Sequence, residues 1–564
     1  MKSFLKLCFP LSVLILLFSS CGKNNETGKM IPSNALFVAQ VNMKSLNSKL
    51  SWDDLKKSSW YQKAYSDPST PDWRKKILDN PSASGIDFDN GLIFFVAKNT
   101  GTDYYVASEG KLKSEKDFEQ FNKNFDSSQT VKNEDGINLL TLKDKNIVGW
   151  NDDHFVYVMN PETTSSEMYK WKDSTSIQQG APPADRSAEL AEICKKLFSL
   201  KSDSSLEKSD KFSALLKETG DIHVWQNNEA IVQSSSMGML SMLKLDAFTK
   251  DNISTYTVDF DNGKIEVDQK GYVSKELSDV LKKYMGNSIN MDMIKNIPSQ
   301  NVFGILAFNF KPEGLTELIK LTGADGLVNT YSQKMGFTLD DFSKSTNGDF
   351  LLAFSDFKMT KSLFNNNDSS GGNLNPGNFN KPDFNFIFSL GVGDKASLQK
   401  IIDAVKQMGS QMGKDSLVND YVMNDKTFAI GSSNTFVNQY LAGNNSKYDF
   451  TDKFSGHPVG FFLDIHKILS EFDAVQSGSQ DHKAMLDQSL NMWNNIISEG
   501  GEFKDGAFAF HTEINLINKD TNSLKQLNNY VNEMYKIKEA KKNDTNHRLD
   551  SLLVPPPIDT VKVK

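Results

Sequence analysis

Two acid–histidine pairs are the residues whose types and spacing best suit catalysis. Asp221 and His223 stand two residues apart, and Asp464 and His466 repeat this spacing later in the chain. On a β-strand such neighbours share a face, so each histidine could act as a base oriented by its carboxylate. No Gly-x-Ser-x-Gly nucleophile motif accompanies them. The alternative interpretation is a duplicated strand end, in which the polar pair caps the helix that follows.

A group of aromatic residues near the N-terminus suggests a second kind of site. Trp52, Trp60, Tyr61 and Trp73 lie within one short region. If these rings are exposed, they could form a stacking platform for a glycan or a docking patch for a protein. If they are buried, they are core and helix packing.

The other residue types indicate no metal or cofactor. The seven histidines form no His-Glu-x-x-His motif, so the sequence predicts no zinc site. The motif DFDNG at 87–91 and 259–263 resembles the start of a calcium loop, but Lys98 and Lys270 stand where that loop requires glutamate. Phosphate-binding and dinucleotide-binding glycine motifs are absent. Cys194 lies on an apolar helical face, which predicts a core residue.

Composition narrows the class of protein. The 564 residues are 38% hydrophobic and 24% charged, which is typical of a globular protein long enough for two or more domains. The formal net charge of −8 provides no basic field for nucleic acid, so we expect no nucleic-acid partner.

The N-terminus carries the features of an export signal. A basic start and an apolar stretch over 7–18 precede Ser-Ser and Cys21. This ending resembles the lipobox of bacterial lipoproteins, which implies that leader 1–20 is removed, that Cys21 is acylated with chains such as palmitate, and that 21–30 form a tether. We expect an outer-membrane anchor, with the periplasmic or surface face left open. The alternative is an ordinary leader with an incidental cysteine.

The mature chain contains an internal duplication. The segment that begins at Ile31 resembles the segment that begins at Ile297, and 221–263 align with 464–506 without a gap. This alignment places the two acid–histidine pairs on one another. It predicts two tandem related domains, residues 31–290 and 291–540.

Local patterns predict an α+β fold with antiparallel sheets and packed amphipathic helices. Asn90-Gly91 and Asn262-Gly263 each predict a tight hairpin between strand-like runs. Apolar residues at helical spacing predict three helices, at 187–200, 275–285 and 523–535. Composition predicts two segments without a fixed fold, a disordered insertion at 364–383 and a flexible tail at 541–564.

Several motifs point to one family. The lipobox ending at Cys21 is followed by IPSNALFVAQVNMKSL, GIDFDNGLIFFVA and VASEGKLKSEKDFEQF. Together these resemble a lipoprotein family of Bacteroidota known only as domain of unknown function 4836. The resemblance implies a cell-envelope protein without an established activity, and it transfers no functional residue.

Three hypotheses about function follow from the sequence. The first is a lipid-anchored envelope protein that acts as a non-catalytic binding or structural module, with the membrane and an envelope protein or glycan as partners. The second is a surface glycan-binding protein that uses the first-half aromatic residues. The third is an envelope hydrolase of unrecognised type that uses the acid–histidine pairs. The missing catalytic motifs favour a non-enzymatic role.

Overall fold

The computed structural model describes most of the chain. The described residues are 28–68, 70–99, 103–125, 130–161, 185–234, 246–285, 288–362, 379–411, 420–474 and 480–553. The predicted leader, Cys21 and most of the tether lie outside them. Helices combine with an antiparallel sheet, which confirms the α+β class.

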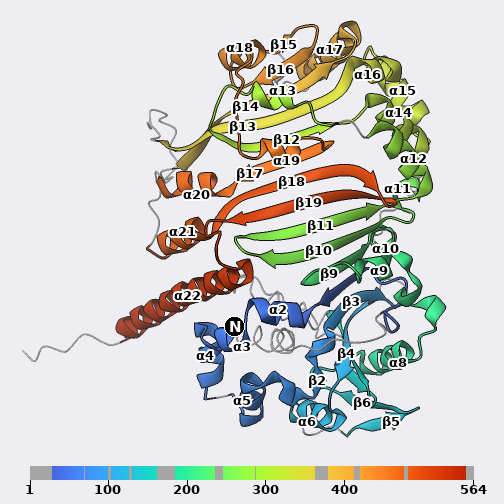
Figure 1. The fold of residues 1–564 in the computed structure, drawn as a ribbon, viewed down its shortest axis with the longest axis vertical. Helices are drawn as coiled ribbons and strands as arrows, with labels where there is room; N and C mark the ends of the chain where they lie inside the picture. Colours follow the sequence, from blue (N-terminus) through green and yellow to red (C-terminus); the bar gives the residue numbers. More distant parts are fainter. Residues whose placement is uncertain are drawn as a thin grey trace, which may run out of the picture.

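One antiparallel sheet runs through both halves of the chain (Figure 1). In order of pairing its strands are β15, β16, β14, β13, β12, β17, β18, β19, β11, β10, β9, β1, β3, β4, β8, β7, β6 and β5, and β2 pairs with one end of β4. The first-half strands are β1 (Phe37–Val41), β2 (Ile86–Asp87), β3 (Leu92–Lys98), β4 (Tyr104–Leu112), β5 (Lys132–Glu134), β6 (Ile137–Thr141), β7 (Ile147–Trp150), β8 (His154–Met159), β9 (Ile222–Asn227), β10 (Ile253–Asp261) and β11 (Lys264–Tyr272). The second-half strands are β12 (Val302–Asn309), β13 (Thr346–Ser362), β14 (Phe379–Val392), β15 (Val422–Met423), β16 (Thr427–Gly431), β17 (Val459–Asp464), β18 (Trp493–Lys504) and β19 (Ala507–Leu516).

Helices lie between these strands in the chain. The first-half helices are α2 (Met43–Lys49), α3 (Trp52–Lys56), α4 (Ser59–Ser66), α5 (Asp72–Asp79), α6 (Glu115–Phe125), α8 (Ser187–Phe198), α9 (Asp210–Leu215), α10 (Asn228–Ser234), α11 (Asp246–Thr249) and α12 (Lys275–Tyr284), with 3-10 turns η1 (Pro81–Ser84), η2 (Phe88–Asn90), η3 (Ser202–Ser204) and η4 (Leu206–Lys208). The second-half helices are α13 (Met291–Lys295), α14 (Pro312–Leu321), α15 (Asp325–Lys334), α16 (Leu339–Ser345), α17 (Lys395–Gln411), α18 (Asn434–Ala442), α19 (Thr451–Phe454), α20 (Ile465–Ala474), α21 (Gln480–Met492) and α22 (Ser523–Leu553).

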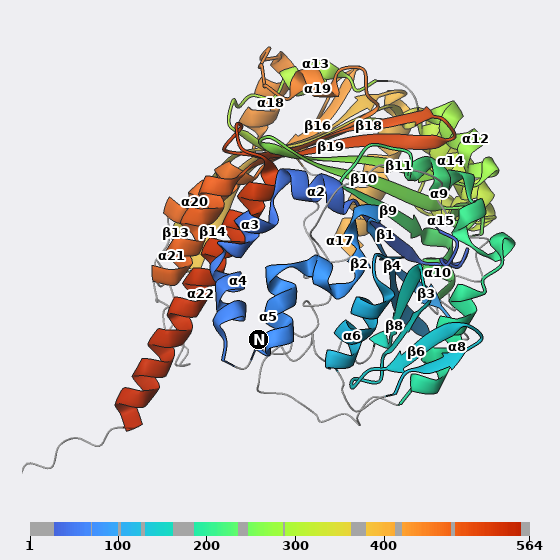
Figure 2. The ribbon, with the colours of Figure 1, turned by 60° about the horizontal axis from the view of Figure 1, so that its bottom comes forward.

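Apolar cores form on both faces of the sheet. On one face, α8 and α9 pack against first-half strands through Ile193 and Phe212, and α18 and α19 pack against second-half strands through Val437 and Phe454. On the opposite face, α2 to α6 cover the first half and α17 covers part of the second. Figure 2 shows α20, α21 and α22 side by side along the edge of the molecule. Each large apolar side chain buried in these cores contributes about 1.5–3 kcal/mol, so the helices hold the sheet between two layers.

The two halves meet where β11 pairs with β19. Each half ends in a hairpin of the same form, β10–β11 and β18–β19, and the two hairpins pair in antiparallel orientation. The junction therefore has approximate two-fold symmetry. The halves share one sheet and do not form domains with separate sheets.

The duplicated DFDNG motif adopts two different structures. The second copy forms the predicted hairpin, with Asp261 opposite Lys264 and a φ of +68° at Gly263. The hairpin predicted at the first copy is wrong, because that copy forms η2, and β2 pairs with β4 instead of β3. There the side chain of Asp87 accepts a hydrogen bond of 3.1 Å from the amide of Asp89, which stabilises the local turn.

The gapless alignment of 221–263 with 464–506 is correct only near its end. Asp221 precedes β9, whereas Asp464 is the last residue of β17. The residue equivalent to Asp464 is Asn227, because each accepts a hydrogen bond from the backbone amide three residues later, at 2.8 Å and 2.9 Å respectively.

The same comparison shows which residue corresponds to Asp221. The amide of Asn42 donates to the backbone oxygen of Asp221, and the amide of Asn309 donates to that of Pro458, both at 2.8 Å. Asp221 therefore corresponds to Pro458. The chain between β9 and β10 is shorter than that between β17 and β18, which a gapless alignment cannot accommodate.

The three predicted helices are present as α8, α12 and α22. Because α22 continues to Leu553, residues 541–553 of the predicted flexible tail are helical, and 554–564 lie outside the described residues. Residues 379–383 of the predicted insertion belong to β14, and 364–378 lie outside the described residues. Among the described helices, none combines the length and hydropathy needed to cross a membrane.

Candidate functional site

Asp221 and His223 are both buried, but they make separate contacts. Lys49 Nζ lies 2.6 Å from Asp221 Oδ2. His223 Nδ1 lies 3.0 Å from Gln40 Oε1, and its Nε2 lies 3.0 Å from the backbone oxygen of Glu218. Since both ring nitrogens have partners other than Asp221, this pair does not form a base with its orienting carboxylate.

The second pair has local structural roles. Asp464 Oδ1 accepts a hydrogen bond of 2.8 Å from the amide of Lys467 and so caps α20. His466 Nδ1 lies 3.1 Å from the backbone oxygen of Leu490. Strands β10, β11, β19 and β18 separate this pair from β9. The capping interpretation is correct for Asp464, and the two pairs do not meet.

The aromatic residues of the first half pack into the core. Trp52 and Tyr61 are 7% and 2% exposed, and both donate hydrogen bonds to the backbone oxygen of Leu78, at 2.9 Å and 2.6 Å. Trp60 and Trp73 are partly buried against the same core. The packing interpretation therefore accounts for these rings, and no exposed platform forms from Trp52 and Tyr61.

Of the cysteines that the sequence singles out, Cys194 lies among the described residues. Cys21 lies outside the described residues. Cys194 is fully buried, and burial raises the pKa of its thiol to about 12. A thiol with this pKa is protonated near neutral pH, which is consistent with a core residue.

Polar side chains cross the middle of the sheet, between the two apolar cores of one face. Asp268 on β11 lies opposite His511 on β19, and Glu499 on β18 lies on the other side of His511. Glu266 and Glu513 form the adjacent cross-strand pair. We name these five residues the polar seam.

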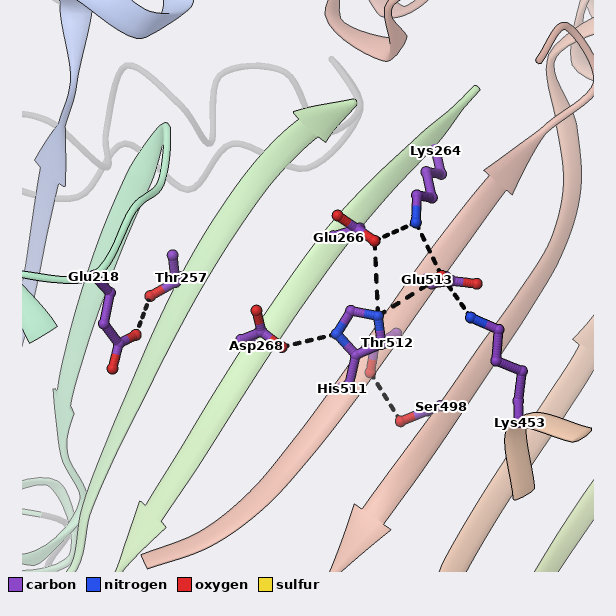
Figure 3. Close-up of polar contacts among 10 residues, drawn as sticks. All are labelled: Glu218, Thr257, Lys264, Glu266, Asp268, Lys453, Ser498, His511, Thr512 and Glu513. Carbon is purple, nitrogen blue, oxygen red and sulfur yellow. Dashed lines mark hydrogen bonds and ion pairs between the residues drawn. The ribbon is translucent and has the colours of Figure 1, made fainter. Parts of the chain in front are cut away.

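His511 is the centre of the polar seam (Figure 3). Its Nδ1 lies 2.7 Å from Asp268 Oδ1, and its Nε2 lies 3.9 Å from Glu266 Oε1 and 3.8 Å from Glu513 Oε1. The hydrogen bond with Asp268 raises the pKa of His511 and lowers the pKa of Asp268. This bond favours a proton on Nδ1 and leaves Nε2 facing two carboxylates.

Two lysines approach the same carboxylates from different elements. Lys264 of β11 contacts both Glu266 and Glu513, and Lys453 of α19 lies 3.0 Å from Glu513 Oε1. Burial acts to raise the pKa of Glu513, but hydrogen bonds from Lys453 and Lys264 outweigh it and hold this pKa at about 2. The carboxylate of Glu513 therefore stays ionised at neutral pH.

Glu499 is the least satisfied member of the polar seam. Glu499 is 7% exposed, and its Oε2 has no hydrogen-bond partner. Burial raises the pKa of this carboxyl group, while the nearby charges of His511 and Lys453 lower it.

Sequence reasoning missed the polar seam for a specific reason. Asp268 and His511 are equivalent positions of the duplication, five residues beyond Gly263 and Gly506 in the same register. Continuing the alignment would have paired them. Nothing in the sequence shows, however, that equivalent strands lie next to one another.

The chemistry of the polar seam suits cations better than nucleophilic attack. Within the described residues, the side-chain partners of His511 are the three carboxylates of Asp268, Glu266 and Glu513. Carboxylates and an imidazole are ligands for positive groups, and nucleophilic catalysis would need a hydroxyl or thiol beside the base.

Comparison with known proteins shows the family of the chain and nothing finer. Neither the curated proteins nor the solved structures contain a significant match to it. The model of the family described as "Domain of unknown function (DUF4836)" matches residues 28–417, which is more than half of the sequence, and the chain belongs to this family.

Proposed function

We propose that the protein is a lipid-anchored protein of the cell envelope that acts by binding and not by catalysis. The anchor is Cys21, which is lipidated before leader 1–20 is cut away just ahead of it, and the protein comes from a member of the Bacteroidota. The basic start, the apolar stretch and the Ser-Ser-Cys ending support this part of the proposal. The proposal places this anchor in the outer membrane.

The polar seam is the observation that supports binding. It is the place where carboxylates and a histidine from both halves converge, and Lys264 and Lys453 already form ion pairs there. The acid–histidine pairs considered as possible bases have structural partners. The buried positions of Trp52 and Tyr61 leave no specific observation in favour of the glycan-binding hypothesis.

The anchor is tested by Cys21→Ala in the native envelope. We expect the wild-type protein to incorporate a radiolabelled or clickable palmitate and to fractionate with the outer membrane. The variant should lose the label and remain as an unprocessed precursor. Cys194→Ala is the matched control, since its thiol is buried and should carry no lipid. An unlabelled wild-type protein would disprove the anchor.

Binding is tested by affinity purification of the full-length protein from mildly solubilised envelope. We expect a component of fixed identity to co-purify in every replicate and to be reduced when Glu513 is replaced by glutamine. Purification of the protein alone, together with release of a small product from envelope material, would favour the hydrolase hypothesis instead.

A further inference from the structure

We infer that the polar seam is a binding site for a divalent transition-metal ion of the zinc type, with Glu266, His511 and Glu513 as ligands. One ligand atom from each of these residues lies within 4.8 Å of the other two. Ligand atoms around a four-coordinate zinc ion, at bonds of about 2.0–2.2 Å, lie about 3.3–3.6 Å apart. The separations of 3.9 and 3.8 Å from His511 Nε2 to the Glu266 and Glu513 oxygens therefore need only a small contraction. The two glutamate oxygens lie within 4.8 Å of each other.

The orientation of His511 is that of a metal ligand. Metal-binding histidines usually donate the proton of the second ring nitrogen to a carboxylate, which fixes the ring and its tautomer. Asp268 provides this carboxylate, 2.7 Å from Nδ1 (Figure 3). Nε2 is then the atom that faces Glu266 and Glu513.

Glu499 provides an independent observation that favours cation binding here. It lies directly opposite His511 on β18, more than nine-tenths buried, and its Oε2 has no hydrogen-bond partner. A buried carboxylate without a partner is costly unless a positive group neutralises it. A metal ion beside His511 would supply that charge, and Glu499, which lies outside the group of three ligands, would accept a hydrogen bond from a metal-bound water.

The imidazole distinguishes between classes of metal. Mg²⁺ and Ca²⁺ prefer oxygen ligands alone, whereas imidazole favours zinc and its neighbours in the first transition series. Two carboxylates with one histidine therefore indicate Zn²⁺ or Co²⁺ over Ca²⁺. Because Glu266 belongs to the first half and His511 and Glu513 to the second, the ion would join β11 to β19.

The lysines beside these carboxylates lead to a prediction that would not hold for an acidic cluster without them. Lys264 contacts both glutamates that would bind the ion, so its ammonium group competes with the metal for the same oxygens. Removing the charge of Lys264 should therefore tighten metal binding. Removing a ligand should weaken it.

The experiment uses full-length protein without a histidine tag, purified in detergent and stripped with a chelator. Zn²⁺ is titrated by calorimetry, and Co²⁺ is followed by its visible absorption, which reports a nitrogen ligand. We expect one equivalent to bind. Binding should weaken at least about 100-fold in His511→Asn and about 10–100-fold in Asp268→Asn, and it should tighten about tenfold in Lys264→Met.

His466→Asn is the matched control, because His466 belongs to α20 and contacts only a backbone oxygen in the described structure. Its affinity should equal that of the wild type. If His511→Asn fails to fold by circular dichroism, Glu266→Gln replaces it, since Glu266 is less buried than Glu513.

Three results would overturn the inference. These are no Zn²⁺ binding by the wild type, equal binding in the ligand variants, and Ca²⁺ binding as tight as Zn²⁺ binding. The inference does not depend on the lipid anchor or on an envelope partner, so it can fail while the proposed function stands, and the reverse also holds.

Discussion

The two halves carry different side chains at equivalent positions of a row of residues that runs across neighbouring strands. In the first half this row holds Gln40 and His223, which hydrogen-bond to each other. In the second half the equivalent positions are Ala307 and Gly460. A Cβ atom at Gly460 would lie 2.7 Å from the ring of Phe454, so the missing side chain lets α19 pack directly on the sheet. Duplication therefore preserved strand pairing, while each half changed its side chains independently.

The largest expected effect is at Asp221, compared with Asp464. Asp221 is fully buried and paired with Lys49, whereas the superficially similar Asp464 caps a helix. Breaking a buried ion pair costs about 3–5 kcal/mol, and losing a cap costs about 1 kcal/mol. Urea denaturation of Asp221→Ala and Asp464→Ala should reproduce this ranking. Equal losses would mean that the two aspartates play equivalent roles after all.

In the first half, the cross-strand row that contains Gln40 continues to Glu109. The equivalent position in the second half is Ser389. Glu109 is 4% exposed, its Oε2 has no hydrogen-bond partner, and burial raises its pKa to about 8. Because the folded pKa lies above the unfolded value of 4.5, stability falls as pH rises from 4.5 towards 8.

The variant Glu109→Gln should remove this pH dependence. Relative to wild type, its free energy of unfolding should change little with pH below 4.5 and gain on the order of 3 kcal/mol between pH 4.5 and pH 7. Denaturation at several pH values measures the difference. A difference that does not change with pH would show that Glu109 stays ionised in the folded state.

Gly460→Ala tests the second half, where Phe454 of α19 packs against Gly460. The new methyl group would overlap the Phe454 ring, and overpacking of this kind costs about 1–3 kcal/mol. Gly326→Ala in α15 is the control, since a Cβ atom there has no neighbour within 4 Å and alanine favours a helix. If both variants unfold at the same temperature as the wild type, α19 does not depend on the small residue.

Asp268→Asn should have the smallest effect, at most about 1 kcal/mol, because the Asp268 side chain is 59% exposed. The pKa of His511 is raised, so its contribution is present below its unfolded value of 6.5 and lost as pH rises through the folded pKa. The pKa of Asp268 is lowered, so its contribution is lost on acidification below 3.8. Thermal unfolding should therefore separate variant from wild type between about pH 4 and 6.5 and not at pH 9. A constant separation would argue against this ion pair.

Sequence reasoning predicted elements well where the cause was local. The apolar spacing of 187–200 predicted α8, and Asn262-Gly263 predicted the β10–β11 hairpin, because backbone preference and a single apolar face decide both. It was wrong at Asn90-Gly91, where the side chain of Asp87 accepts a hydrogen bond from the amide of Asp89 and stabilises a different turn. The candidate site was not predicted, since its ligands come from strands that are far apart in the chain.

By itself the sequence determined the α+β class, the duplication and the core location of Cys194, because composition, periodicity and repetition report these directly. The family was recognised from the resemblance of its motifs, and the family model confirms it. Only the tertiary structure decided that the halves share one sheet and that Asp268 meets its own counterpart, His511. Strand order is set by pairing between distant segments, whose geometry leaves no local signature. The same long-range pairing separated Asp221 from His223 in role and brought Glu266, His511 and Glu513 together.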